Sequence, residues 1–75
     1  MIHELDQVAL TVDLSAYHLK AGDVGTVVDI TPNSRQVTLE FFNFDGETIA
    51  VVPVSASQVR QIGNREVAHA RVIEG

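Results

Sequence analysis

Hydrophobic residues alternate with polar ones along several short stretches of this chain. The clearest stretch is 36–41, in which Val37, Leu39 and Phe41 share one phase and polar residues take the other. A period of two is typical of a β-strand with one buried face. Alternation and enrichment in β-branched residues together predict five strands, over 7–12, 26–31, 36–41, 48–52 and 59–62.

Glycine and small polar residues separate the first three predicted strands. Residues 13–22 indicate a long irregular connection. Gly22 and Gly25 follow, just before a β-branched run, which indicates a tight turn feeding a strongly bent strand. At Gly25, and less strongly at Gly22, we expect a positive φ or close packing of the backbone. Residues 32–35 form a turn cluster that begins with proline.

The later connections carry equally local signals. Asp45-Gly46 is a hairpin signal between the third and fourth strands. Pro53 is expected to end the fourth strand, because proline cannot donate to a central ladder. Residues 55–58 are too few for an α-helix and suit a single 3₁₀ turn before the fifth strand.

The last twelve residues fit two different patterns. Ala68, Ala70 and Val72 alternate with His69 and Arg71, which favours an extra edge strand. The competing interpretation is a short helix with Asn64 as its N-cap. We therefore divide the chain into a barrel over 1–63 and a C-terminal tail over 64–75.

Five short strands, a long first loop and a 3₁₀ turn before the last strand predict an all-β fold, a small five-stranded SH3-like barrel. An OB-fold is the alternative, but it needs a longer chain and a helix between its third and fourth strands. The alternating phase places in the core Val8, Leu10, Val28, Ile30, Val37, Leu39, Phe41 and Val59.

Charge and composition narrow the classes of partner. Ten acidic and five basic residues give a formal net charge of −5, which argues against binding to a phosphate backbone. No apolar run approaches the roughly 20 residues that cross a bilayer, so we expect no membrane partner. The first residues lack the basic and apolar regions of a signal peptide. The chain has no cysteine, and we expect a cytoplasmic protein.

Candidate chemistry is sparse. His3, His18 and His69 lack the short spacing of metal ligands. Ser55 and Ser57 lack a nucleophile-elbow motif and are expected to cap a turn. The carboxylates of Asp23 and Asp45 are expected to accept hydrogen bonds within their own turns, and Gly22 and Gly25 precede a strand rather than a phosphate-binding helix. We therefore expect no catalytic residue, metal or cofactor.

The aromatic residues are the candidate binding residues. Phe42 lies out of phase with the core, Phe44 falls at a hairpin tip, and Tyr17 lies in the long first loop. Exposed aromatic residues often mark interfaces, so Tyr17, Phe42 and Phe44 are predicted to form a partner-binding patch. The alternative is that Phe42 and Phe44 fold back over the end of the barrel as satellite core.

Several motifs carry a resemblance to known proteins. These are Leu5-Asp6-x-Val8-x-Leu10, Leu19-x-x-Gly22-Asp23-x-Gly25-Thr26-Val27-Val28, Asp45-Gly46-Glu47-Thr48 and Val59-Arg60. The pattern, over residues 2 to about 70, resembles a family of small bacterial proteins that share a domain of unknown function with an SH3-like barrel. The Gly-Asp-x-Gly-Thr-Val element is also similar to KOW-type segments and to the barrel of the nitrile hydratase β subunit.

The resemblance implies a fold and no activity, so function rests on the residues. We expect a non-enzymatic protein-interaction module, a small regulatory or accessory protein that binds a protein partner or a second copy of itself. One specific form is an acidic inhibitor of antitoxin or immunity type. Two further functions stay open, namely KOW-like nucleic-acid binding and the role of an accessory subunit of a separately encoded enzyme.

Overall fold

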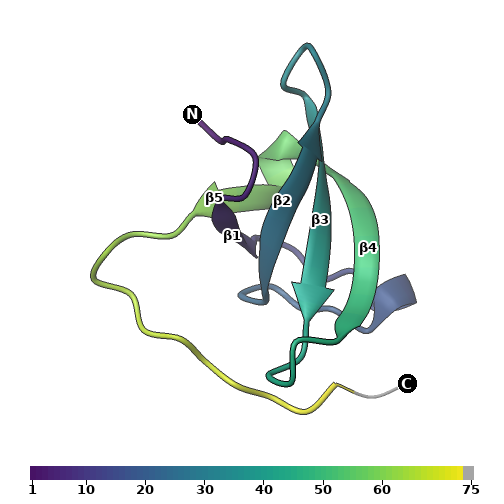
Figure 1. Ribbon diagram of the computed structural model, residues 1–75, viewed down its shortest axis with the longest axis vertical. Coiled ribbons are helices and arrows are strands. Elements are labelled where there is room, and N and C mark those ends of the chain that lie inside the picture. The colour runs from purple at the N-terminus through teal and green to yellow at the C-terminus, as the bar shows by residue number, and fades with distance from the viewer. Residues whose placement is uncertain (74–75) are drawn as a thin grey trace.

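The computed structural model describes residues 1–73, which form one antiparallel sheet of five strands with two short 3₁₀ turns (Figure 1). The strands are β1 (Gln7–Leu10), β2 (Val24–Ile30), β3 (Gln36–Phe42), β4 (Thr48–Ser55) and β5 (Val59–Gln61), and the turns are η1 (Ser15–Tyr17) and η2 (Ala56–Gln58). The strand order is β4-β3-β2-β1-β5. The predicted all-β class, the five strands and the 3₁₀ turn before the last strand are confirmed.

The core lies on one side of the sheet, where residues directly opposite one another on β2, β3 and β4 form apolar rows. One row joins Val27, Leu39 and Val52, all of them buried. Of the residues predicted for the core, those found buried are Val8, Leu10, Val37, Leu39, Phe41 and Val59. Cross-strand neighbours of this kind are the unit from which a sheet gains its stability.

The prediction for β2 was wrong by one residue. Val27 is fully buried, whereas Val28, predicted to be in the core, is 36% exposed, and Ile30 is half-buried against the core. The cause is a β-bulge: Val27 pairs with Leu39 and Asp29 with Thr38, so Val28 has no partner of its own. A bulge inserts one residue and reverses the alternation beyond it. Val27 and Ile30 can therefore both face inward.

Two predicted strand ends also need correction. β1 ends at Leu10, and Val12, predicted to lie in that strand, is exposed. Pro53 does not end β4, which continues to Ser55. β4 lies at the edge of the sheet and pairs only with β3. An edge strand tolerates proline because its nitrogen can face away from the single neighbouring strand.

The turns are held largely by their own side chains. Ser55 Oγ accepts a hydrogen bond from the Ser57 N–H at 3.3 Å, and the Gln58 side chain accepts from the Ser55 N–H at 2.9 Å, so the predicted capping of η2 is confirmed. In the β3–β4 hairpin, Asn43 Oδ1 accepts from the N–H groups of Asp45 and Glu47, at 3.0 and 2.9 Å. Asn43, and not the predicted Asp45, therefore organises that turn.

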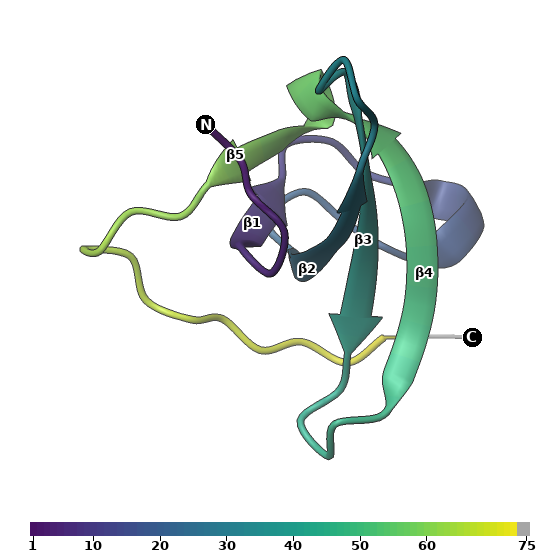
Figure 2. The same ribbon diagram turned by 45° about the horizontal axis from the view of Figure 1, so that its top comes forward.

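The tail does not continue the sheet. Residues 64–73, which we call the arm, contain no strand and no helix, so the predicted strand over 68–72 and the alternative helix after Asn64 were both wrong. In Figures 1 and 2 the arm leaves β5, swings wide of the sheet, and returns to the end of the molecule that holds the β3–β4 hairpin. Residues 74–75 lie outside the described part of the chain.

The two glycines before the bend in β2 differ in what they require. Gly22 has a φ of +93°, a backbone angle that residues with a side chain rarely adopt. Gly25 has no positive φ, but a Cβ at this position would lie 3.0 Å from the ring of Phe41 and 3.3 Å from Leu39 Cβ. Close packing, and not a positive φ, is therefore the reason for glycine at Gly25.

Replacing Leu39 with alanine tests the assignment of the core. Leu39 is fully buried, and its truncation should lower the free energy of unfolding by about 2–5 kcal/mol. Urea denaturation followed by circular dichroism measures the loss. Val51→Ala is the control, because Val51 is 54% exposed and its truncation should cost about 1 kcal/mol or less. Equal losses in the two variants would contradict the assignment.

Replacing Gly25 with valine tests the close packing. The new side chain must displace the Phe41 ring, and overpacking of this kind costs about 1–3 kcal/mol. The urea midpoint should fall clearly below that of Gly63→Ala, because a Cβ at Gly63 meets only Glu66 Oε2, at an ordinary 3.5 Å. A Gly25→Val protein as stable as the wild type would show that the site has room.

Candidate functional site

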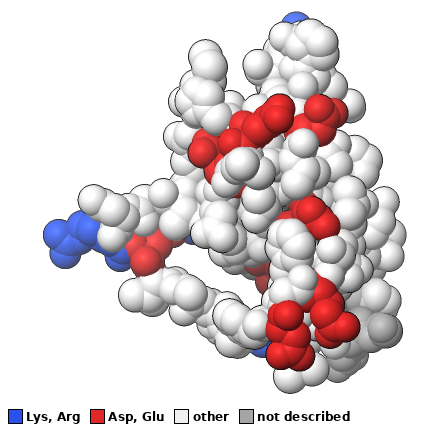
Figure 3. Space-filling model, viewed as in Figure 1, with Lys and Arg blue, Asp and Glu red and all other residues white. Residues whose placement is uncertain are grey.

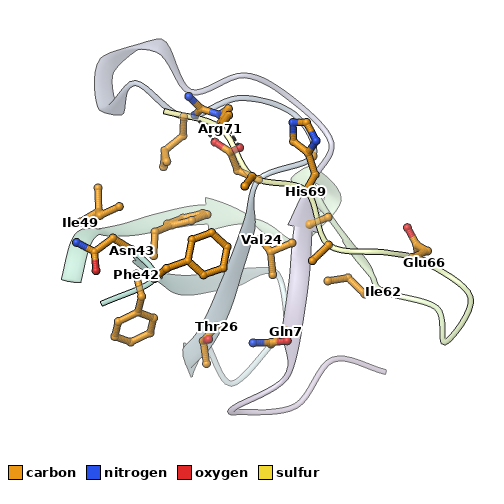
Figure 4. A pocket seen from close by; sticks show the side chains of 18 of the residues that line it. Gln7, Val24, Thr26, Phe42, Asn43, Ile49, Ile62, Glu66, His69 and Arg71 are labelled. Carbon is orange, nitrogen blue, oxygen red and sulfur yellow. Dashed lines mark hydrogen bonds and ion pairs between the residues drawn. The ribbon is translucent and has the colours of Figure 1, made fainter. Parts of the chain in front are cut away.

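A groove of about 560 Å³ lies between the arm and the sheet, on the side away from the core. Its sheet wall includes Val24 from β2, Phe42 from β3 and Ile49 from β4, and each of these side chains is 40–47% exposed. Figure 4 shows Phe42 between Ile49 and Val24, with Ile62 beyond Val24 and His69 and Arg71 on the opposite side. The groove is of the size that holds a ligand or a short segment of a partner.

Strand β1 also contributes to the lining of the groove. Ala9 alternates along β1 with the core residues Val8 and Leu10, so it lies on the side of the sheet that faces the groove. Only 2% of its surface is exposed. The Ala9 side chain is therefore almost completely covered where it lines the groove.

The first anchor of the arm is an ion pair beside β5. Arg60 Nη2 lies 2.7 Å from Glu66 Oε1, and Arg60 Nη1 and the Gly63 N–H donate to Glu66 Oε2 at 2.9 and 2.6 Å. The hydrogen bond from Arg60 is the largest influence on the Glu66 carboxyl, and it lowers the pKa from the ordinary 4.5 to about 2. The start of the arm is therefore fixed to the end of the sheet.

The second anchor joins the end of the arm to the turn before β2. Arg71 Nε donates to Asp23 Oδ1 at 2.8 Å, and Arg71 Nη2 donates to Asp23 Oδ2 and, at 2.9 Å, to the His18 carbonyl. The pair is only partly exposed, at 25% for Arg71 and 17% for Asp23. Such a bidentate contact fixes the relative orientation of the two side chains and also stabilises the pair.

The Asp23 carboxylate is held in its charged form. Partial burial alone would raise its pKa, but the hydrogen bonds from Arg71 and from the Lys20 N–H, with the charge of Arg71, lower the pKa below the ordinary 3.8. The Lys20 N–H donates to Asp23 Oδ2 at 2.8 Å, so the predicted role of Asp23 in its own turn is confirmed.

Between these anchors the arm is open. Within the described chain, residues 67–73 make no backbone–backbone hydrogen bonds. Between the anchors, Val67 is 92% exposed. Beyond Arg71, Val72 is 86% exposed and Ile73 packs against the core. The middle of the arm therefore presents free backbone groups beside the groove.

The sheet surface next to the groove is both apolar and acidic. Its residues lie on β2, β3 and β4 on the side away from the core, and we call this surface the outer face. They are Thr26, Val28, Asp29, Thr38, Glu40, Phe42, Thr48, Ile49, Val51 and Pro53. Figure 3 shows acidic side chains over β2, β3 and the β3–β4 hairpin, with basic ones only at the margins of that view.

Glu40 occupies the middle of the outer face. It pairs across the sheet with Thr26 on one side and Val51 on the other. Thr48 Oγ1 donates to Glu40 Oε2 at 2.6 Å, which fixes the carboxylate in place. Asp29 stands opposite Thr38 in the next outward row, so both carboxylates point away from the core.

The structure brings together two of the three predicted aromatic residues. Phe42 is 47% and Phe44 90% exposed, and both line the groove, so neither is satellite core. Tyr17, on η1, is 44% exposed but is not among the residues that line the groove. The sequence interpretation missed the groove and its arm. No signal pointed to Arg71 and Asp23 as partners, because 48 positions separate them.

Residues 1–73 were compared with the patterns of a metal-ligand cluster and of a membrane-spanning helix. Within that range no group of three or more His, Asp or Glu side chains could hold a metal ion. No helix there is long and apolar enough to cross a membrane.

Acidification should release the arm. Both anchoring carboxylates have pKa values lowered by folding, so each anchor is fully present above the ordinary pKa, 3.8 for Asp23 and 4.5 for Glu66. Each is lost as the pH falls through the folded value, which for Glu66 is about 2. The ¹⁵N heteronuclear NOE of residues 67–70 should therefore fall between pH 4.5 and 2.

Substitution of Arg71 tests the same anchor at pH 7. Arg71→Gln should lower the heteronuclear NOE of residues 67–70, and the control Arg65→Gln should not. An unchanged NOE in Arg71→Gln would show that the ion pair does not hold the arm.

Comparison with known proteins gives one family and no function. Curated proteins and solved structures yielded no match. A domain of unknown function, DUF4926, matches residues 4–61. The match includes the whole sheet, Phe42 and Phe44, and ends before the arm. Since it extends over most of the sequence, the chain belongs to the DUF4926 family.

Proposed function

We propose that this protein is a non-enzymatic protein-interaction module, a small regulatory or accessory protein built on an SH3-like barrel. The barrel is supported by the path of the sheet, in which β1 pairs with β2 on one side and with β5 on the other. Figure 2 adds the strong curvature of β4 around the core. The long connection over 13–22 and the 3₁₀ turn before β5 also fit this fold.

The observation that carries the proposal is the exposure of Phe42 and Phe44 at the groove. A domain of 75 residues has little apolar surface to spare for its core, yet it leaves two phenylalanines in solvent on one hairpin. Buried aromatic anchors dominate the energy of protein interfaces. The hairpin and the groove beside it therefore form the docking site, with Phe44 as its most exposed aromatic residue.

Other functions have less support from the described residues. The outer face contains Asp29 and Glu40 and no lysine or arginine, which disfavours binding to RNA or DNA. The roles of an inhibitor and of an accessory subunit are forms of the proposal, and they differ only in what the partner does.

A photo-crosslinking experiment tests the docking site. A photoreactive phenylalanine analogue replaces Phe44 in the native host, and the matched control places it at Arg35, in the exposed turn at the opposite end of β3. We expect a discrete adduct with one protein from position 44 and none from position 35. No adduct at position 44, or the same adducts at both positions, would contradict the proposal.

Phe44→Ala then separates binding from folding. Because Phe44 is 90% exposed, its truncation should change the free energy of unfolding by no more than about 0.5 kcal/mol. The affinity of the purified partner should fall by about tenfold or more, as it does when an interface anchor is removed. Loss of stability together with affinity would mean that Phe44 supports the fold instead.

A further inference from the structure

The outer face combines features that a free protein surface seldom has. Five of its exposed residues are apolar, namely Val28, Phe42, Ile49, Val51 and Pro53. Val51 is the cross-strand neighbour of Glu40, and Phe42 lies two residues further along β3. Exposed apolar side chains beside a carboxylate on one face of the sheet point to a surface that another protein covers.

Ion pairing elsewhere leaves this face acidic. Of the five basic side chains, Arg60 is paired with Glu66 and Arg71 with Asp23, and both pairs hold the arm. The others are Lys20, Arg35 and Arg65, and none of them belongs to the outer face. Within residues 1–73, Asp29 and Glu40 form no ion pair with lysine or arginine.

The charge selects among the possible occupants. The outer face of a second copy carries the same negative charge, and like charges brought together at an interface are repelled. A purely apolar partner would bury both carboxylates without an opposite charge, which carries a large desolvation cost. A partner with lysine or arginine satisfies the carboxylates and covers the apolar residues together.

We infer that the outer face docks a basic protein surface, with Glu40 as its central charge contact. This inference rests on the proposed function and names the chemistry of the partner. Thr48 already donates to Glu40 Oε2 and holds the side chain in place. The carboxylate is therefore oriented before binding, which reduces the entropy lost when the contact forms.

The experiment begins with a photoreactive residue at Val51, the cross-strand neighbour of Glu40. The protein that it captures in the native host is identified, expressed and purified as the probe. Its affinity is measured for wild type, Glu40→Gln, Glu40→Lys and the control Asp13→Asn. Asp13 lies on the 13–22 connection and accepts a hydrogen bond from the Ala21 N–H at 2.9 Å, which the asparagine oxygen can also accept. Thermal melts confirm that each variant folds.

The inference predicts an ordered result. Glu40→Gln should weaken binding by about tenfold and Glu40→Lys by more, while Asp13→Asn stays within about twofold. The affinity of the wild type should fall as NaCl is raised from 50 to about 500 mM, because salt screens the charges that the two surfaces share.

The remaining outcomes separate the inference from the proposed function. If position 44 yields an adduct and position 51 none, or if the captured protein binds Glu40→Lys as tightly as wild type, the inference is wrong and the proposed function stands. Binding that does not depend on salt also overturns it. If neither position yields an adduct, both are wrong.

Discussion

Two β-bulges give this small sheet its two different sides. In β2, Val28 is inserted between the pairs Val27–Leu39 and Asp29–Thr38, and in β4, Ile49 is inserted between the partners of Phe41 and Phe42. Each bulge turns an apolar residue outward, and the bulge in β2 also restores the inward phase beyond it, at Ile30. Without the first bulge, Val27 and Ile30 could not both face the core. The same local insertions therefore complete the core and enrich the outer face.

How much the sequence could predict depends on whether each residue acts through its neighbours or through distant contacts. Strict alternation over 36–41 placed β3 correctly, because a period of two is a local property. The bulge in β2 could not be seen, since Val27 and Val28 are the same residue type and either could face inward. Asn43 and Asp45 posed the same difficulty in the hairpin, where both residue types can hold a turn.

The residues of the candidate site also divide into those that local sequence identifies and those that depend on distant contacts. Phe42 and Phe44 could be singled out because their phase and turn position are read along the chain. The groove depends on the arm, and the arm depends on Arg71 meeting Asp23 across 48 positions. The alternating alanines at 68 and 70 resembled a strand, but alanine buries little apolar area and no neighbouring strand within the described residues pairs with it.

The charges and the apolar residues of the outer face have different effects on what can bind there. A 75-residue domain that exposes valine, isoleucine and phenylalanine on one surface risks sticking to its own copies. Asp29 and Glu40 oppose that contact by like-charge repulsion, while they attract a surface of opposite sign. The hydrophobic effect cannot make this distinction because it has no sign, so specificity must come from the carboxylates. In the proposed complex, the apolar residues would supply the buried area, and the charges would decide which surface can cover it.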